Sequence, residues 1–214
     1  MKIGILGTGM VGAALGRKFT QLGHQVKMGS RTANNEAAAK WVKASGSNAS
    51  QGTFSDAASF GELVFICLNG AVFLEVVKGL NAKDLSGKVL VDVSNPLDFS
   101  RGMPPSLSIS NTNSLGEEVQ KAVPSAKVVK TLNIVNCDVM IDPAKGGNPT
   151  MLLCGNDAEA KKKVTALLNS LGWRDIIDLG DITRSRGMEM LVPLWLNLFG
   201  VFGNPHFGLK VIRG

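Results

Sequence analysis

The sequence predicts an α/β fold of the Rossmann type, a doubly wound, mostly parallel sheet with a small C-terminal α/β lobe. An apolar run over residues 2–6 leads straight into a glycine-rich turn. Near-continuous apolar runs of strand length recur further along the chain, which is typical of parallel strands covered on both faces. Segments with apolar side chains at helical spacing alternate with these runs, as expected for βαβ units.

The first half of the chain contains four predicted strands, at residues 1–6, 24–28, 62–68 and 88–93. A helix over residues 11–22 follows the first strand, because apolar side chains recur there at helical spacing, and Gly23 ends it. A second helix over residues 71–80 connects the third and fourth strands and places its apolar side chains on one stripe. These elements alternate as a doubly wound sheet requires.

The second half contains three predicted strands, at residues 126–132, 150–154 and 174–179. A helix opens at Ser114, which resembles the first residue of a capping box, and ends before Pro124. A helix over residues 157–171 has one apolar face and stops at Gly172. Residues 187–199 predict a strongly apolar helix, which we expect to lie in the core or at a subunit interface.

Length indicates a single domain over residues 1–214, with a Rossmann core at 1–145 and a smaller C-terminal lobe at 146–214. The boundary falls at Gly146-Gly147-Asn148-Pro149, a sequence typical of a turn. No internal repeat is visible in the sequence.

The turn after the first strand reads Gly7-Thr8-Gly9-Met10-Val11-Gly12. In this pattern Gly7 permits a tight turn, Gly9 lets the backbone approach a pyrophosphate, and Gly12 lets the helix pack close to the strand. The helix N-terminus then points at the negative charge. The motif has a strand before it and a helix after it, and this context predicts a dinucleotide site.

The end of the second predicted strand indicates which dinucleotide binds. NAD enzymes place an acidic side chain there, whereas this chain has Ser30-Arg31-Thr32 and no acid until Glu36. A guanidinium can bind a 2'-phosphate through charge-assisted hydrogen bonds, and neighbouring hydroxyls can add to the site. We therefore expect NADP(H). The alternative is that Arg31 is a solvated loop residue and the glycines only make a tight turn.

Two asparagines follow the next two strands of the predicted sheet. Asn69 comes after the strand at 62–68, and Asn95 after the strand at 88–93. Ligands of doubly wound sheets bind outside the carboxyl ends of the strands, so we expect both side chains near the nicotinamide ribose or ring. Both residues are also common turn formers, which is the alternative explanation.

Composition excludes several classes of protein. The net charge of +6 and pI near 9.3 come without a lysine–arginine cluster interleaved with aromatics, so anionic cofactors explain the excess better than nucleic acid. No apolar stretch is long enough to span a bilayer, and we expect a cytoplasmic protein with no membrane partner. Cys67, Cys137 and Cys154 lack metal-ligand spacing, so no metal site is expected.

The chain has few groups for acid–base chemistry. It contains no tyrosine, which excludes the Tyr–Lys arrangement of short-chain dehydrogenases. His24 is expected in a turn away from the site, and His206 is expected to cap a turn, with a place near the site as the alternative. Hydride exchange between two organic cofactors needs alignment more than a proton relay. We therefore assign no catalytic acid or base and expect cofactor-to-cofactor transfer.

Several segments together resemble the NADP reductases that depend on coenzyme F-420. They are Gly7 to Gly12, Gly29-Ser30-Arg31, Ser100-Arg101-Gly102, Cys154-Gly155-Asn156-Asp157, and Ser185-Arg186 through Pro193, Asn197 and Gly208. The resemblance covers nearly the whole chain. The sequence is also similar to the NADPH-binding module of the six-transmembrane epithelial antigen metalloreductases.

The resemblance implies that hydride passes between NADP(H) and a deazaflavin stacked in one cleft. It implies NADP contacts from Thr8, Gly9, Met10, Val11, Ser30 and Arg31, with Asn95, Asn136 and Cys137 lining the nicotinamide side. Archaeal members have His-Thr-Ile-Pro where this chain has residues 133–136, and a proline where it has Asn69. These departures fall on the acceptor side, where Asn133 and Val135 would contact the substrate and a flavin could also stack.

The sequence therefore predicts an NADP(H)-dependent oxidoreductase that exchanges hydride with coenzyme F-420. One alternative is an NADPH-dependent flavin or ferric-chelate reductase, with FMN, FAD or a ferric chelate as acceptor. An alternative of another class is a redox sensor that binds NADPH without turnover. A β-hydroxyacid dehydrogenase is disfavoured because that family needs a long helical second domain. The chain is expected to bind only small-molecule cofactors, and a homodimer remains open.

Overall fold

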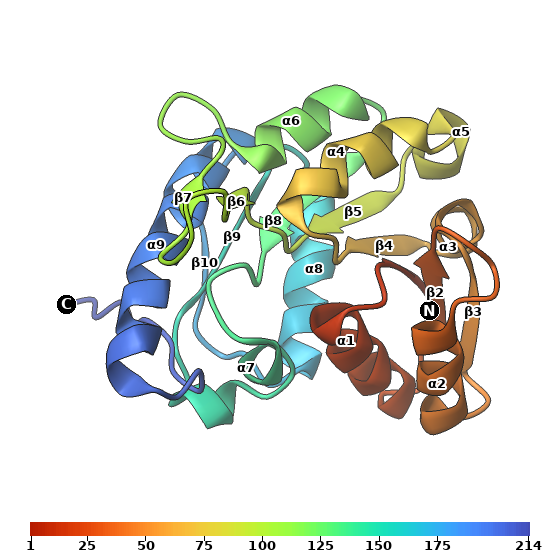
Figure 1. Ribbon diagram of the computed structural model, residues 1–214, viewed down its shortest axis with the longest axis horizontal. Coiled ribbons are helices and arrows are strands. Elements are labelled where there is room, and N and C mark those ends of the chain that lie inside the picture. Colours follow the sequence, from red (N-terminus) through yellow and green to blue (C-terminus); the bar gives the residue numbers. More distant parts are fainter.

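The computed structural model describes residues 1–70 and 72–214. Its main sheet has eight strands in the order β10-β9-β8-β5-β4-β1-β2-β3 (Figure 1). In chain order these strands are β1 (Lys2–Leu6), β2 (Gln25–Ser30), β3 (Ala49–Thr53), β4 (Leu63–Ile66), β5 (Val89–Asp92), β8 (Lys127–Thr131), β9 (Met151–Gly155) and β10 (Ile176–Asp178). A separate two-stranded sheet pairs β6 (Leu97–Asp98) with β7 (Ser106–Leu107).

The strand pairing is that of a Rossmann fold. From β3 across to β8 every neighbouring pair is parallel, in the order 3-2-1-4-5-8. Successive strands are added in one direction from β1 to β3 and in the opposite direction from β4 onward, so the strand order reverses between β1 and β4. Doubly wound sheets bind their ligands at this point. The pair β8–β9 is antiparallel and β9–β10 is parallel. The predicted fold class is therefore confirmed.

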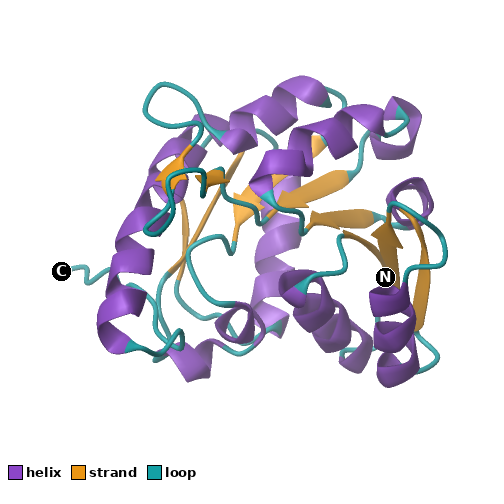
Figure 2. Cartoon of the chain, in the orientation of Figure 1, coloured by secondary structure: helices purple, strands orange, loops and turns teal.

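Helices cover both faces of the sheet (Figure 2). They are α1 (Met10–Gln21), α2 (Glu36–Ser45), α3 (Phe54–Phe60), α4 (Gly70–Gly79), α5 (Ala82–Leu85), α6 (Leu115–Ala122), α7 (Cys137–Ile141), α8 (Ala158–Ser170) and α9 (Ser185–Phe202). One buried cluster contains side chains of α1, α2, α7 and α8, and the other contains side chains of α3, α4, α5 and α6.

Strand residues contribute to these two clusters alternately. Ile3 and Ile5 of β1 belong to the first cluster, whereas Leu6 belongs to the second. This alternation follows from the pleat, which sends successive side chains to opposite faces. Because both faces are buried, the strands read as continuous apolar runs in the sequence.

The segment from α2 to α3 has no counterpart among the predicted elements. Its strand, β3, reads Ala-Ser-Gln-Gly-Thr and lies at the edge of the sheet, so no apolar run marked it. The helix α3 is short, and its N-cap is Thr53, whose side chain makes a capping box with Asp56. These elements form through pairing with β2 and local capping rather than through apolar patterning.

The C-terminal part of the chain continues the main sheet. β9 follows the turn at residue 147 and pairs with β8, so no break in the sheet accompanies the change from core to lobe. The division at residues 145 and 146 stays a prediction. Within the described ranges, no helix is long and apolar enough to cross a membrane.

Candidate functional site

The carboxyl ends of the parallel strands open onto adjoining cavities. The first, of about 470 Å³, is lined at its polar end by Gly7, Thr8, Ser30, Arg31 and Thr32, and we name it the Arg31 cavity. The second, of about 530 Å³, includes Gly9, Met10, Val11, Asn69 and Asn95 in its lining, and we name it the Asn95 cavity. Leu68 lines both cavities, so they form one groove along the sheet edge.

The glycine turn has the geometry that a pyrophosphate site requires. Gly7 has a φ of +124°, and a Cβ there would lie 2.3 Å from the carbonyl oxygen of Cys67. A Cβ on Gly12 would lie 2.4 Å from the carbonyl oxygen of Gly7, so α1 packs directly against the turn. A Cβ on Gly9 would meet nothing within 4 Å. Gly9 therefore leaves open space in the groove.

The N-terminus of α1 carries no protein cap. Its N-cap residue, Gly9, makes no side-chain cap hydrogen bond, and the first turn contains no acidic residue. The first amides of a helix lack intrahelical partners and, together with the helix dipole, favour an anion. This helix end is therefore suited to a phosphate group.

Polar groups at the end of β2 line the other half of the groove. Among the described residues Arg31 has no ion-pair partner, and it is exposed. The buried Ser30 hydroxyl donates to the carbonyl oxygen of Thr32 at 2.5 Å, so that hydroxyl must rotate before it can donate to a ligand. Glu75 of α4 lines an adjoining cavity that shares Ser30 and Arg31.

The Asn95 cavity combines amide and apolar groups. Asn69 and Asn95, from the ends of β4 and β5, meet there with Leu97 and the half-exposed Phe99. The Cys67 thiol also lines this cavity, and burial together with the charge of Asp92 raises its pKa well above the ordinary value. The thiol is therefore protonated at neutral pH.

The remaining predicted site residues do not line these two cavities. The Asn136 side chain accepts a hydrogen bond from the amide of Asp138 at 2.9 Å and caps α7. Cys137 is half-buried, and burial raises the pKa of its thiol. Asn133 and Val135 are buried, at 4% and 7% exposure. None of these four residues lines the Arg31 or Asn95 cavity as described.

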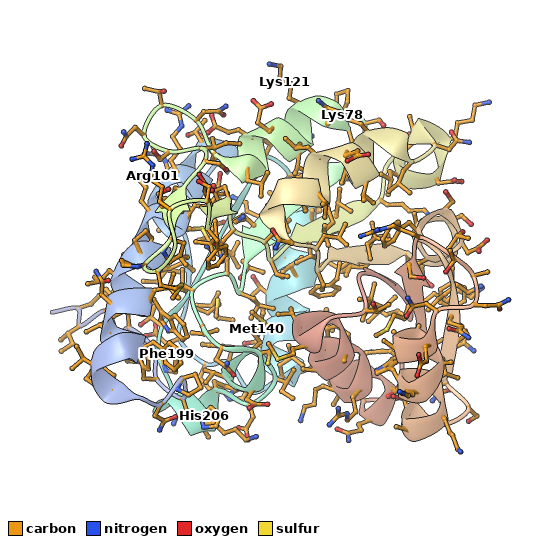
Figure 3. All side chains as sticks on the ribbon, in the orientation of Figure 1. Lys78, Arg101, Lys121, Met140, Phe199 and His206 are labelled. Atoms are coloured by element: carbon orange, nitrogen blue, oxygen red, sulfur yellow. The ribbon has the colours of Figure 1, made fainter. Side chains whose placement is uncertain are left out.

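The two histidines lie apart from the groove lining. His24 precedes β2 at the amino edge of the sheet, and burial lowers the pKa of its imidazole. His206 follows α9, near α7 in Figure 3, and its Nε2 lies 3.0 Å from Oδ2 of Asp138. The backbone amide of His206 donates to Oδ1 of Asn204, which makes the turn that the sequence predicts.

A buried ion triad behind the Asn95 cavity was missed by sequence reasoning. The Lys130 ammonium lies 2.9 Å from Asp92 Oδ2 and 2.9 Å from Glu189 Oε1, and it donates to the carbonyl oxygen of Ser94 at 2.6 Å. All three charged side chains are at most 1% exposed. Asp92 ends the otherwise apolar strand β5, and Lys130 follows two valines in β8, and that was the available signal.

The hydrogen bonds show how the triad is balanced. Burial lowers the pKa of Lys130, but the two carboxylates outweigh burial and raise it overall. Burial raises the pKa of Glu189. Each Glu189 oxygen nevertheless accepts an amide hydrogen, from Leu115 or Gly116 at the start of α6. These two amides and the Lys130 ammonium all donate to the carboxylate, so these contacts favour the ionised form.

The fold and the groove together define a dinucleotide-binding protein of the Rossmann class. The sequence profile described as "NADP oxidoreductase coenzyme F420-dependent" matches residues 2–96. The F420-dependent NADP reductase of Methanocaldococcus jannaschii is 32% identical over 157 residues, which cover 73% of this chain and 70% of that protein. The chain belongs to this family of NADP-dependent oxidoreductases.

Other proteins are similar over most of the chain. A candidate F420-dependent NADP reductase of Arthrobacter sp. FB24 has a crystal structure with a TM-score of 0.95 and 44% identity, and all of both chains is covered. The rat metalloreductase STEAP3 is 30% identical over 201 residues, which cover 91% of this chain. This chain matches only 38% of the length of STEAP3.

A more distant structure shares the fold alone. The NADPH complex of a reductive aminase from Aspergillus terreus has a TM-score of 0.67 and 21% identity, covering 94% of this chain and 62% of that one. This likeness supports the Rossmann assignment.

Proposed function

We propose that the protein exchanges a hydride between NADP(H) and coenzyme F-420, with the dinucleotide extended along the groove. One observation carries the proposal: an arginine and a helix N-terminus belong to the same groove, and among the described residues the first has no ion-pair partner and the second no side-chain cap. These are the groups that a 2'-phosphate and a pyrophosphate need.

Each half of the groove has a proposed role. Gly7, Thr8, Gly9, Met10, Val11 and Gly12 would bind the pyrophosphate through backbone amides, and Ser30 and Arg31 would bind the 2'-phosphate. Asn69 and Asn95 would hydrogen-bond the nicotinamide ribose or ring. Asn136 and Cys137 would lie beyond the ring, and Asn133 and Val135 would lie on the acceptor side. Gly9 favours this arrangement because it leaves space for phosphate oxygens.

The chemistry would depend on alignment. Reduced nicotinamide, when bound, supplies a hydride that a second planar ring accepts. The lining of the Asn95 cavity includes Met10, Leu97 and Phe99, whose apolar side chains would pack against the two rings. Its polar side chains are two amides, the Ser94 hydroxyl and the Cys67 thiol, and we assign none of them the role of acid or base.

The similarity to STEAP3, named as a metalloreductase, favours a second candidate. In that function FMN, FAD or a ferric chelate would take the place of coenzyme F-420. A redox sensor that binds NADPH without turnover uses the same cofactor groove and is the third possibility.

One assay separates these functions. The protein is mixed anaerobically with NADPH and, in turn, coenzyme F-420, FMN, FAD or a ferric chelate, and the absorbance of nicotinamide and acceptor is followed. We expect fastest NADPH oxidation with coenzyme F-420. Faster oxidation with a flavin or chelate would replace the first proposal by the second. Tight NADPH binding without oxidation by any acceptor would indicate the sensor.

A further inference from the structure

The Asn95 side chain is held by a residue behind the cavity. Its Nδ2 donates to the backbone oxygen of Asn133 at 2.8 Å, and its Oδ1 accepts from Nδ2 of Asn133 at 2.9 Å. This reciprocal pair determines which way the Asn95 carboxamide is turned, because exchanging its O and N atoms would break both bonds. One amide hydrogen of Asn95 is not used in these contacts and can serve a ligand.

Asn133 is itself fixed from two sides. The second hydrogen of its Nδ2 donates to the carbonyl oxygen of Met188 in α9 at 3.1 Å. The preceding residue, Leu132, has a φ of +62°, which costs a bulky L-residue conformational energy. Such strain persists where surrounding contacts impose it, and it is concentrated at functional sites. Here the positive φ of Leu132 turns the chain at the end of β8, next to the Asn133–Asn95 pair.

Stability alone does not explain this arrangement. The Oδ1 atom of Asn133 is buried and has no hydrogen-bond partner among the described residues. A buried acceptor left unsatisfied lowers the stability of the fold. A retained cost of this kind at a buried side chain calls for an explanation beyond packing.

The ion triad fixes Ser94, the residue before Asn95 in the loop after β5. Lys130 donates to the carbonyl oxygen of Ser94, and Asp92 accepts from the amide and the hydroxyl of Ser94. The triad partner Glu189 follows Met188 in α9, which accepts from Asn133. The Ser94–Asn95 segment is therefore fixed at its backbone by the triad and at its side chain by Asn133.

We propose that Asn133 is a positioning residue that orients the Asn95 carboxamide for the nicotinamide half of the dinucleotide. The ligand would be a carboxamide-bearing ring with its ribose, which offers donors and acceptors complementary to an amide. This inference rests on the proposed function, and it places the action of Asn133 on Asn95 rather than on a hydride acceptor. The adenosine half of the groove is independent of Asn133.

The test compares two ligands that share the adenosine half. Asn133→Asp keeps the shape of the side chain but loses its donor to Asn95. Titration should show about tenfold weaker binding of NADPH, because the carboxamide loses its orientation, and binding of 2',5'-ADP unchanged within about twofold. Asn95→Ala should give the same selective loss, and Asn133→Asp should add little to it in the double variant.

Folding defects are controlled separately. Gln120→Met removes hydrogen bonds with the backbone of residues 126 and 128, near the amino end of β8. The groove lies at the carboxyl ends of the strands, so this variant should leave both affinities unchanged. Asn133→Ser replaces Asn133→Asp where circular dichroism shows that the aspartate variant is unfolded. Equal weakening of both ligands, or no change in either, would overturn the positioning role. A wild-type protein that binds neither ligand would overturn the proposed function itself.

Discussion

Single residues determine the shape and the charge of the groove in which we propose that the dinucleotide binds. At Gly9 the absence of a Cβ leaves space, whereas at Gly7 and Gly12 a Cβ would strike backbone atoms. Arg31 supplies a positive charge without an ion-pair partner among the described residues. The absence of a Cβ therefore matters in two ways: at Gly7 and Gly12 it lets the backbone pack closely, and at Gly9 it leaves the space in which we propose that the pyrophosphate binds.

Gly9→Val should abolish dinucleotide binding and leave the fold intact. The backbone at Gly9 is extended, with φ of −76°, so valine is tolerated, but its side chain would fill the open space in the groove. Isothermal titration with NADPH and circular dichroism measure the two effects. Gly187→Val is the matched control, because a Cβ there also meets nothing within 4 Å. Retained NADPH binding in the Gly9 variant would contradict the assigned site.

Arg31→Asp should weaken NADPH binding about tenfold or more and leave NADH binding nearly unchanged. The substitution replaces a charge-assisted contact with the 2'-phosphate by a like-charge repulsion, and NADH lacks that phosphate. The ratio of the two Michaelis constants is the measurement. Arg174→Asp makes the same charge change at another exposed arginine, outside the cavities described. An unchanged ratio would rule out the proposed role of Arg31.

At the scale of elements, apolar patterning located buried strands and helices of the main sheet, whereas the elements from α2 to α3 were not predicted. The residues from α2 to α3 form elements whose signals are an edge pairing and side-chain caps. At α6 the predicted cap is present, since Ser114 accepts from the amide of Glu117. The Glu117 carboxylate, however, bonds Arg186 of α9 and so connects two helices far apart in sequence.

Arg186→Met should reduce stability at neutral pH, with the loss disappearing in acid. The hydrogen bonds from Arg186 lower the pKa of Glu117, against the opposing effect of burial. A carboxyl with a lowered folded-state pKa stabilises the fold above the ordinary value near 4.3, and this stabilisation is lost as pH falls through the folded-state pKa. Urea unfolding at pH 7, 5 and 3 measures the difference from wild type.

The control for this experiment is Lys162→Met, which removes an exposed ion pair with Glu159. It should change the free energy of unfolding little at any of these pH values. A difference between Arg186→Met and wild type that stays constant from pH 7 to pH 3 would show that the ion pair is not its source.

At the scale of the whole molecule, the Asp92–Lys130–Glu189 triad joins the centre of the sheet to α9. Asp92 and Lys130 belong to the predicted core and Glu189 to the predicted C-terminal lobe, so the triad connects these two parts of the chain. The outer side of α9 leaves Met190, Leu194, Val201 and Phe202 exposed. A homodimer stays a prediction.

Lys130→Met should destabilise the protein by about 3–5 kcal/mol, because two buried carboxylates lose their shared cation. The change in the free energy of unfolding is obtained from urea denaturation at pH 7. Lys40→Met, which removes an exposed pair with Glu36, is the matched control and should cost less than about 1 kcal/mol. Equal effects of the two substitutions would show that the triad is not a source of stability.

The sequence by itself determined the Rossmann-type fold class, the glycine turn and the position of Arg31 after the second strand, because strands and turns depend on neighbouring residues. It also predicted that Asn69 and Asn95 meet, since the carboxyl ends of parallel strands share one edge. Only the tertiary structure decided that Asn133 contacts Asn95 and that Lys130 joins Asp92 to Glu189. These contacts join residues 38 to 59 positions apart along the chain, and no local pattern encodes such a contact.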